Sequence, residues 1–297
     1  MRRTTATLIG FSAVVLWALL AFFTVASAPV PPLLLNALCF GIGGAVGLVW
    51  LLMSGGIGRL RGVPLSVYAF GIAGLFGYHF LYFSALRMAP PAEAGLIAYL
   101  WPLFIVLFSG LLPGERLRAG HVAGALCAFG GAAIIVAGSA RGVDGSRGGY
   151  ALAFLAALTW ASYSLISRRL GHVPTAAVTV FCLGSSALAL MAHLALEVPA
   201  WPQGLWGWGA VLALGLGPVG LAFFTWDHGV KHGDIKALGA ASYAAPLLST
   251  ILLVLFGRGE ASWMLAIACV LIVGGAVLAA KDMFARSPVP PDIAEKP

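Results

Sequence analysis

The chain has 297 residues, of which 61% are hydrophobic and 9% are charged, and its formal net charge is +7. With a mean hydropathy of +0.98, it has too few polar side chains to cover a water-soluble globule, which excludes a soluble enzyme or binding protein. The basic residues lie in short joints between apolar stretches and form no cluster. They therefore predict membrane topology and no nucleic-acid partner.

Ten apolar stretches follow one another along the chain, each close to the roughly 20 residues that a transmembrane helix needs. They cover residues 5–27, 30–53, 64–86, 92–112, 119–140, 148–170, 175–196, 205–229, 237–256 and 261–280. Turn-forming and charged residues mark the joints between them, and a polar tail follows at residues 284–297. The sequence predicts an all-α membrane protein with ten transmembrane helices.

The first stretch resembles a signal peptide, because Arg2 and Arg3 precede its apolar run and small residues follow it. That run is longer than the about 7 to 15 residues of a signal sequence, and it contains Trp17, which has a counterpart in the second half. We therefore expect the stretch to be kept as a helix. With the N-terminus inside, thirteen Lys and Arg residues fall in inner joints and four in outer joints. This bias predicts that both ends are cytoplasmic.

The second half of the chain repeats features of the first. The matching residues, at offsets of 143 to 145, are Trp17 with Trp160, Tyr99 with Tyr243, Pro102 with Pro246, Gly114-Glu115 with Gly259-Glu260, and Gly130-Gly131 with Gly274-Gly275. They predict two five-helix repeats, at residues 1–141 and 147–283. Because five is an odd number, the second repeat must be inverted in the membrane, an arrangement that places a substrate site between the halves near the bilayer midplane.

Residues 77–110 carry aromatic and polar side chains at depths where a lipid-facing helix would carry aliphatic ones. Pro102 removes a backbone donor there, which frees local backbone groups to face a cavity. Tyr99 and Trp101 are two residues apart and would face apart on a regular helix. Only a distortion near Pro102 would bring both to one space.

These features resemble a known family. Two five-span repeats with a kinked fourth helix, a Gly-Glu turn and a Gly-rich fifth helix, as in AYLWPLFIVLFSGLLPGERLRAGHVAGALCAFGGAAIIV, are similar to the EamA domains of the drug/metabolite transporter superfamily. The AYLWP segment and the aromatic third and fourth spans look most like the YddG-type exporters of aromatic and other amino acids. The resemblance implies a bacterial inner-membrane transporter that moves amino acids outward from a central cavity between the repeats.

Aromatic and polar side chains deep in the spans are the candidate substrate-binding residues, since rings accept apolar side chains while hydroxyl and indole groups meet the polar end of a substrate. They are Trp17, Tyr78, His79, Tyr82, Tyr99, Trp101, Trp160, Tyr163, Trp226 and Tyr243. The alternative for these rings is simple helix packing, and for Trp201, Trp206 and Trp208 we favour an interfacial belt. His79 could contact a ligand, carry protons or only join helices by a hydrogen bond.

Nothing in the sequence calls for a metal or a cofactor, because the four cysteines lie in four different apolar spans without CxxC spacing. The expected partners are small-molecule substrates and membrane lipid, with no obligate protein partner. The small residues of the second, third and eighth spans could serve close helix packing or hinging. No acidic residue lies at the midplane, which favours a facilitator or exchanger over proton antiport.

Other functional classes stay open to different degrees. A membrane-embedded enzyme would need a nucleophile, metal ligands or paired carboxylates within the spans, and HExxH and GxSxG motifs are absent from the sequence. The internal repeat is the main argument against a structural or receptor-like protein. A channel would require a continuous pore. Among transporters, a multidrug or nucleotide-sugar substrate remains an alternative.

Overall fold

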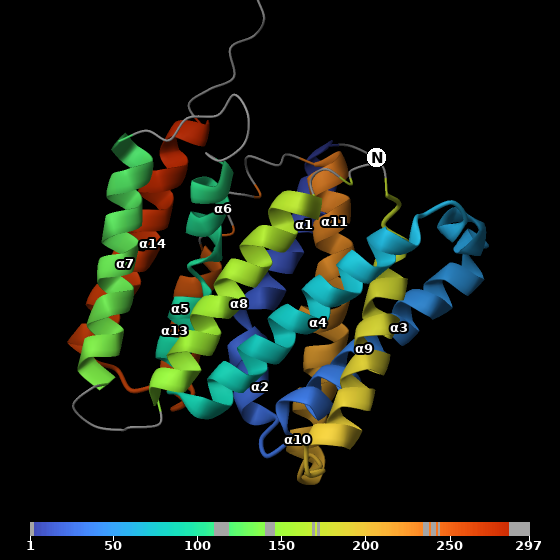
Figure 1. Cartoon of the computed structure of the whole chain (residues 1–297), viewed down its shortest axis with the longest axis horizontal. Coiled ribbons are helices and arrows are strands. Elements are labelled where there is room, and N and C mark those ends of the chain that lie inside the picture. The colour runs from blue at the N-terminus through green and yellow to red at the C-terminus, as the bar shows by residue number, and fades with distance from the viewer. Residues whose placement is uncertain are drawn as a thin grey trace, which may run out of the picture.

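The computed structural model describes residues 3–109, 119–139, 146–167, 170, 173–233, 238, 242 and 244–284, and these residues form helices and their connections, with no strand among them (Figure 1). Six helical segments in this part of the chain are long and apolar enough to cross a membrane. They are Arg3–Ala26, Pro32–Met53, Leu65–Met88, Ser146–Ser167, Ala177–Leu196 and Gly204–Gly229. Tyr243 and residues 285–297 of the predicted tail lie outside the described residues.

The helices follow the predicted spans closely. The first half contains α1 (Arg3–Ala18), α2 (Leu20–Ala26), α3 (Pro32–Met53), the short 3₁₀ helix η1 (Gly56–Leu60), α4 (Leu65–Met88), α5 (Pro91–Ala98), α6 (Trp101–Ser109) and α7 (Ala119–Ser139). The second half contains α8 (Ser146–Ser167), α9 (Ala177–Leu196), α10 (Gly204–Leu216), the π-helical turn η3 (Gly217–Leu221), α11 (Ala222–His232), α13 (Ala244–Leu255) and α14 (Trp263–Phe284).

Proline sets the start of several helices. Pro32 and Pro91 each occupy the first turn of their helix, and Pro64 stands immediately before α4. Proline suits these positions because its fixed φ matches the helix and its missing N–H would have no partner there. The joints that the sequence marks with proline are therefore the places where new helices begin.

Helices from the two halves pack against one another in pairs: α1 with α11, α3 with α9, α4 with α8 and α7 with α14 (Figure 1). Close contacts at glycines give the direction of each pair. On α3, for example, Gly41 faces Ser186 and Gly47 faces Thr179, so residue numbers rise along α3 as they fall along α9. The same opposition holds for α7 and α14, where Gly131 faces Ala268 and Gly275 faces Gly124. The paired helices are antiparallel.

Three of the predicted spans are interrupted. The first breaks at Leu19 between α1 and α2, the fourth at residues 99–100 between α5 and α6, and the eighth at η3 between α10 and α11. Pro102 and Pro218 explain two of the breaks, because each lacks the N–H that would bond the carbonyl four residues earlier and its ring clashes with that carbonyl. The freed backbone groups are buried within the protein, where an interrupted transmembrane helix is tolerated.

Candidate functional site

The rings predicted from the sequence gather at one place, between the α1–α11 pair and the α4–α8 pair. Trp160 on α8 lies at its centre. Its ring centroid is 6.1 Å from Trp17, 5.1 Å from Tyr78, 6.5 Å from Trp101, 5.2 Å from Tyr163 and 5.8 Å from Phe223. These five partners come from α1, α4, α6, α8 and α11. One indole therefore joins helices of both halves.

The connected rings form a group that we call the ring cluster. Its members are Trp17, Phe40, Phe70, Tyr78, His79, Tyr82, Phe83, Trp101, Trp160, Tyr163, Phe223 and Trp226. Eight of the ten residues predicted from the sequence are in this group. Tyr99 reaches it through a hydrogen bond, described below, and Tyr243 lies outside the described residues.

Helix α4 contributes two neighbouring aromatic stripes to the ring cluster, as its four-residue spacings predict. Tyr78 stacks on Tyr82 at 5.8 Å, and His79 meets Phe83 edge to face at 5.5 Å. His79 is 1% exposed. Its Nδ1 lies 2.9 Å from the carbonyl oxygen of Leu75. A carbonyl only accepts, so Nδ1 carries the hydrogen in this bond, and when the ring is neutral Nε2 is its acceptor nitrogen.

The break between α5 and α6 explains how Tyr99 and Trp101 reach one region, although they would face apart on a regular helix. Both side chains are buried and both reach the same region, because the helix ends at Ala98 and restarts at Trp101. Tyr99 donates its hydroxyl hydrogen to the carbonyl oxygen of Trp17 at 2.9 Å. Trp17 precedes the break at Leu19, so this bond joins two interrupted helices.

Sequence reasoning missed two central members of the ring cluster, Phe40 and Phe223. The Phe223 ring lies 6.0 Å from Trp17, 5.7 Å from His79 and 6.3 Å from Phe40. Phenylalanine is common in any apolar span, so its residue type carries no signal. The only available hint is the Gly217-Pro218 interruption just before α11, which marks an irregular turn but does not indicate where Phe223 points.

Three charged side chains of the described residues make contacts outside the ring cluster, two of them near helix ends. Glu197, just after α9, accepts hydrogen bonds from the backbone N–H groups of Leu33 and Leu34 at 2.9 and 3.1 Å, and His193 Nδ1 lies 2.8 Å from it. It thereby caps the first turn of α3, where an anion is favourable. Sequence reasoning missed this cap, because the partners are more than 160 residues apart.

Arg87, in the last turn of α4, donates to the carbonyl oxygens of Thr24 and Val30 and to Ser27 Oγ, at 2.9 to 3.2 Å. It holds the turn between α2 and α3 against α4. Asp227, on α11, accepts a hydrogen bond from Thr175 Oγ1. These contacts fit structural roles at the two ends of the bundle.

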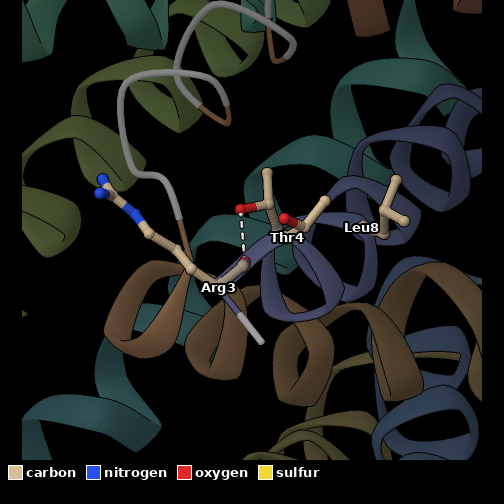
Figure 2. Close-up of a pocket in the computed structure, with 4 residues that line it drawn as sticks. Arg3, Thr4 and Leu8 are labelled. Atoms are coloured by element: carbon tan, nitrogen blue, oxygen red, sulfur yellow. Dashed lines mark hydrogen bonds between the residues drawn. The ribbon is translucent and has the colours of Figure 1, made fainter. Parts of the chain in front are cut away.

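Metal ligands are not brought together in the described part of the chain, where no group of three or more His, Cys, Asp or Glu residues could hold an ion. A surface cavity of about 290 Å³ lies at the start of α1, lined by Arg3, Thr4, Thr7 and Leu8 (Figure 2). Thr7 donates to the Arg3 carbonyl oxygen there at 3.0 Å. This cavity is more than two helical turns from Trp17 along α1 and is separate from the ring cluster.

Large aromatic side chains that the sequence predicts as cavity lining are buried against one another in the ring cluster. Trp17, Tyr78, Trp101 and Trp160 are each 7 or 8% exposed. The rings touch in stacked, tilted and edge-to-face arrangements, and stacked and edge-to-face contacts are favourable for aromatic pairs.

Comparison with known proteins gives the family. The model of the EamA-like transporter family matches the chain twice, at residues 4–137 and 147–281. The chain belongs to the EamA-like transporter family. The two matches fall on the two halves that the internal repeat distinguishes.

Curated relatives of this EamA-like chain are named as transporters. It is 54% identical over 283 residues to the aromatic amino acid exporter YddG of Ancylobacter novellus, covering 94% of this chain and 98% of that protein. It is 25% identical to the aromatic amino acid exporter YddG of Escherichia coli K12, covering 94% and 97%. A solved crystal structure that is 53% identical matches with a TM-score of 0.75, covering 96% of this chain and 100% of its own.

Proposed function

We propose that this protein exports aromatic and other neutral amino acids across the bacterial inner membrane. The observation that carries the proposal is the 54% identity, over nearly the whole of both chains, to a protein named as an aromatic amino acid exporter. Insertions or missing segments would weaken such a transfer, and this alignment covers 98% of the relative.

The substrate site in this proposal is the ring cluster together with Tyr99, and with Tyr243 as the repeat counterpart of Tyr99. Rings from α1, α4, α6, α8 and α11 would stack on the substrate side chain, which suits aromatic amino acids best. Phe40 and Phe223 join the set that the sequence predicts. The ammonium group of the substrate can also be attracted by the faces of tryptophan and tyrosine rings.

Alternating access is the transport mechanism that we propose. Helices in equivalent positions of the two halves, α3 with α9 and α7 with α14, are antiparallel neighbours, as two inverted repeats would require. A site between inverted repeats can be exposed to each side in turn by rocking one set of helices against the other. The excess of Lys and Arg in the inner joints favours cytoplasmic termini, and the exposed aliphatic side chains on the outside of the bundle would face lipid.

Flux through reconstituted vesicles tests the proposed function. Vesicles that contain the purified protein should release radiolabelled tryptophan, phenylalanine and tyrosine faster than protein-free vesicles, with drugs and a nucleotide sugar moving more slowly. Biotin belongs in the panel, because the biotin transporter of Escherichia coli K12 is 30% identical over 54% of this chain. Flux of a drug, a nucleotide sugar or biotin without flux of any amino acid would overturn the proposal.

A further inference from the structure

One polar atom within the ring cluster has no partner. The Tyr82 side chain is 1% exposed, and its hydroxyl makes no hydrogen bond to any described residue. Leaving a buried hydroxyl unsatisfied costs roughly 1 to 3 kcal/mol. A phenylalanine would fill the same space without that cost, so the unpaired hydroxyl needs an explanation.

The neighbours of the Tyr82 hydroxyl do not supply a fixed acceptor. Its ring stacks on Tyr78 and meets Phe83 edge to face at 6.2 Å. The phenol groups of Tyr78 and Tyr99 are close enough to interact with it electrostatically, but neither accepts a hydrogen bond from it. The Tyr82 hydroxyl is thus an uncommitted donor beside the rings that would hold a substrate.

His79 provides the complementary group one turn away on the same helix face, since residues three apart on a helix are neighbours. Its Nδ1–H is used by Leu75, so in the neutral ring Nε2 is an acceptor. A zwitterionic amino acid offers an ammonium group, which only donates, and a carboxylate, which only accepts. Within the ring cluster these two side chains supply one donor and one acceptor, which together match both ends of the substrate. The Asp227 carboxylate, which is close enough to interact with Tyr163, already accepts a hydrogen bond from Thr175.

We propose that Tyr82 and His79 form the head-group subsite of the transported amino acid, with the Tyr82 hydroxyl donating to the substrate carboxylate and His79 Nε2 accepting from its ammonium group. The inference rests on the proposed function and deepens it. In this proposal the indole rings of the ring cluster contact the substrate side chain. Tyr82 and His79 on α4 bind the carboxylate and ammonium groups of the α-carbon. The preferred ligand class is then an aromatic amino acid with a free carboxylate, in preference to the corresponding amine.

Competition binding tests this subsite. Purified protein in lipid nanodiscs is loaded with radiolabelled tryptophan. Two competitors are then added: tryptamine, which lacks the carboxylate, and indole-3-propionate, which lacks the ammonium group. The wild type should bind tryptophan at least about tenfold more tightly than tryptamine, since a hydrogen bond to a charged group is worth roughly 10- to 100-fold in affinity. Equal affinities would overturn the subsite.

The Tyr82→Phe variant gives the sharper result. It should weaken binding of tryptophan and indole-3-propionate about tenfold or more and leave tryptamine within about twofold of wild type. It should also unfold at the same temperature as wild type or higher, because it removes an unsatisfied buried hydroxyl. A uniform loss for all three compounds, unchanged tryptophan binding, or earlier unfolding would each overturn the assignment.

Tyr68→Phe is the matched control on the same helix. Its hydroxyl donates to the Leu60 carbonyl oxygen at 3.1 Å, near η1, so that variant should lose a little stability and keep wild-type binding of all three compounds. A wild type that binds neither tryptophan nor the two analogues would overturn the proposed function itself, whereas a wild type that binds tryptophan while Tyr82→Phe behaves like Tyr68→Phe would overturn only the subsite.

Discussion

The ring cluster and the α7–α14 interface are two ways in which this protein joins its halves. Along α7 and α14 the backbones touch, and a Cβ placed on Gly275 would lie 2.5 Å from the carbonyl oxygen of Gly124. In the ring cluster, large side chains bridge helices, with centroid distances of 5 to 6.5 Å around Trp160. Backbone contact leaves one arrangement, whereas rings on separate helices can be repacked. We infer that the first region is a fixed scaffold and the second is the adaptable site.

Overpacking the scaffold should have the largest effect. Gly275→Leu should lower stability by about 3 kcal/mol, or roughly 6 to 12 °C in melting temperature, because its side chain would meet backbone atoms of Gly124 and Ala128 at less than 3.0 Å. Thermal unfolding of the purified protein, followed by size-exclusion chromatography, measures the change. Gly274→Leu is the control, since a Cβ on Gly274 meets nothing within 4 Å. Similar melting temperatures for the two variants would remove the distinction between scaffold and site.

Truncating the centre of the ring cluster should damage transport and spare the fold. Trp160→Ala and Trp101→Ala are expected to lower tryptophan flux at least about tenfold, as buried aromatic contacts often do in binding sites, while the amount of protein in the membrane stays near wild type. Trp206→Ala should leave flux unchanged, because Trp206 is 66% exposed. Parallel loss of flux and of protein in the two buried variants would make the rings part of the scaffold.

Tyr99 combines a role in the ring cluster with a role in holding the fold, because its ring reaches the cluster and its hydroxyl bonds the backbone of α1. Tyr99→Phe should cost about 1 kcal/mol of stability, the usual contribution of one hydrogen bond, and reduce flux only a few-fold. Tyr99→Ala should reduce flux further without lowering membrane expression. If Tyr99→Phe already removes all flux, the bond to the Trp17 carbonyl oxygen is essential to the transport cycle.

His79 offers the smallest expected change. His79→Gln keeps a side-chain acceptor for the substrate ammonium group, so the hydrogen bond should be weakened and not lost and flux should fall only about two- to fivefold. Its dependence on pH should parallel that of wild type. Flux of both proteins measured between acidic and alkaline pH checks this. A pH dependence that disappears in the variant would make His79 a proton carrier.

The sequence predicted the region where the rings gather better than it predicted which rings gather there. The internal repeat marked Trp17, Trp160 and Tyr99, and a repeated residue in an apolar span is informative because lipid contact does not require it. Pro102 predicted the interruption that brings Tyr99 and Trp101 to the same region. Both predictions rest on residue types with strong local preferences, which are visible without a structure.

Other features could not be predicted, because they depend on which helices meet. Phe223 is one of many phenylalanines, and only the packing of α11 against α1 places it at the centre of the ring cluster. The missing partner of the Tyr82 hydroxyl is likewise a property of the assembled bundle. The cap that Glu197 gives to α3 joins the two halves of the chain and has no local signal in either segment.

The most direct test of the ring cluster as the substrate site is a crystal structure with 5-bromotryptophan, whose bromine is located by anomalous scattering. We predict a single strong peak among Trp17, Trp160 and Phe223, with those rings displaced around the bound indole. A peak confined to the surface cavity beside Arg3 or to the outer face of the bundle, or no peak at saturating concentration, would contradict the account.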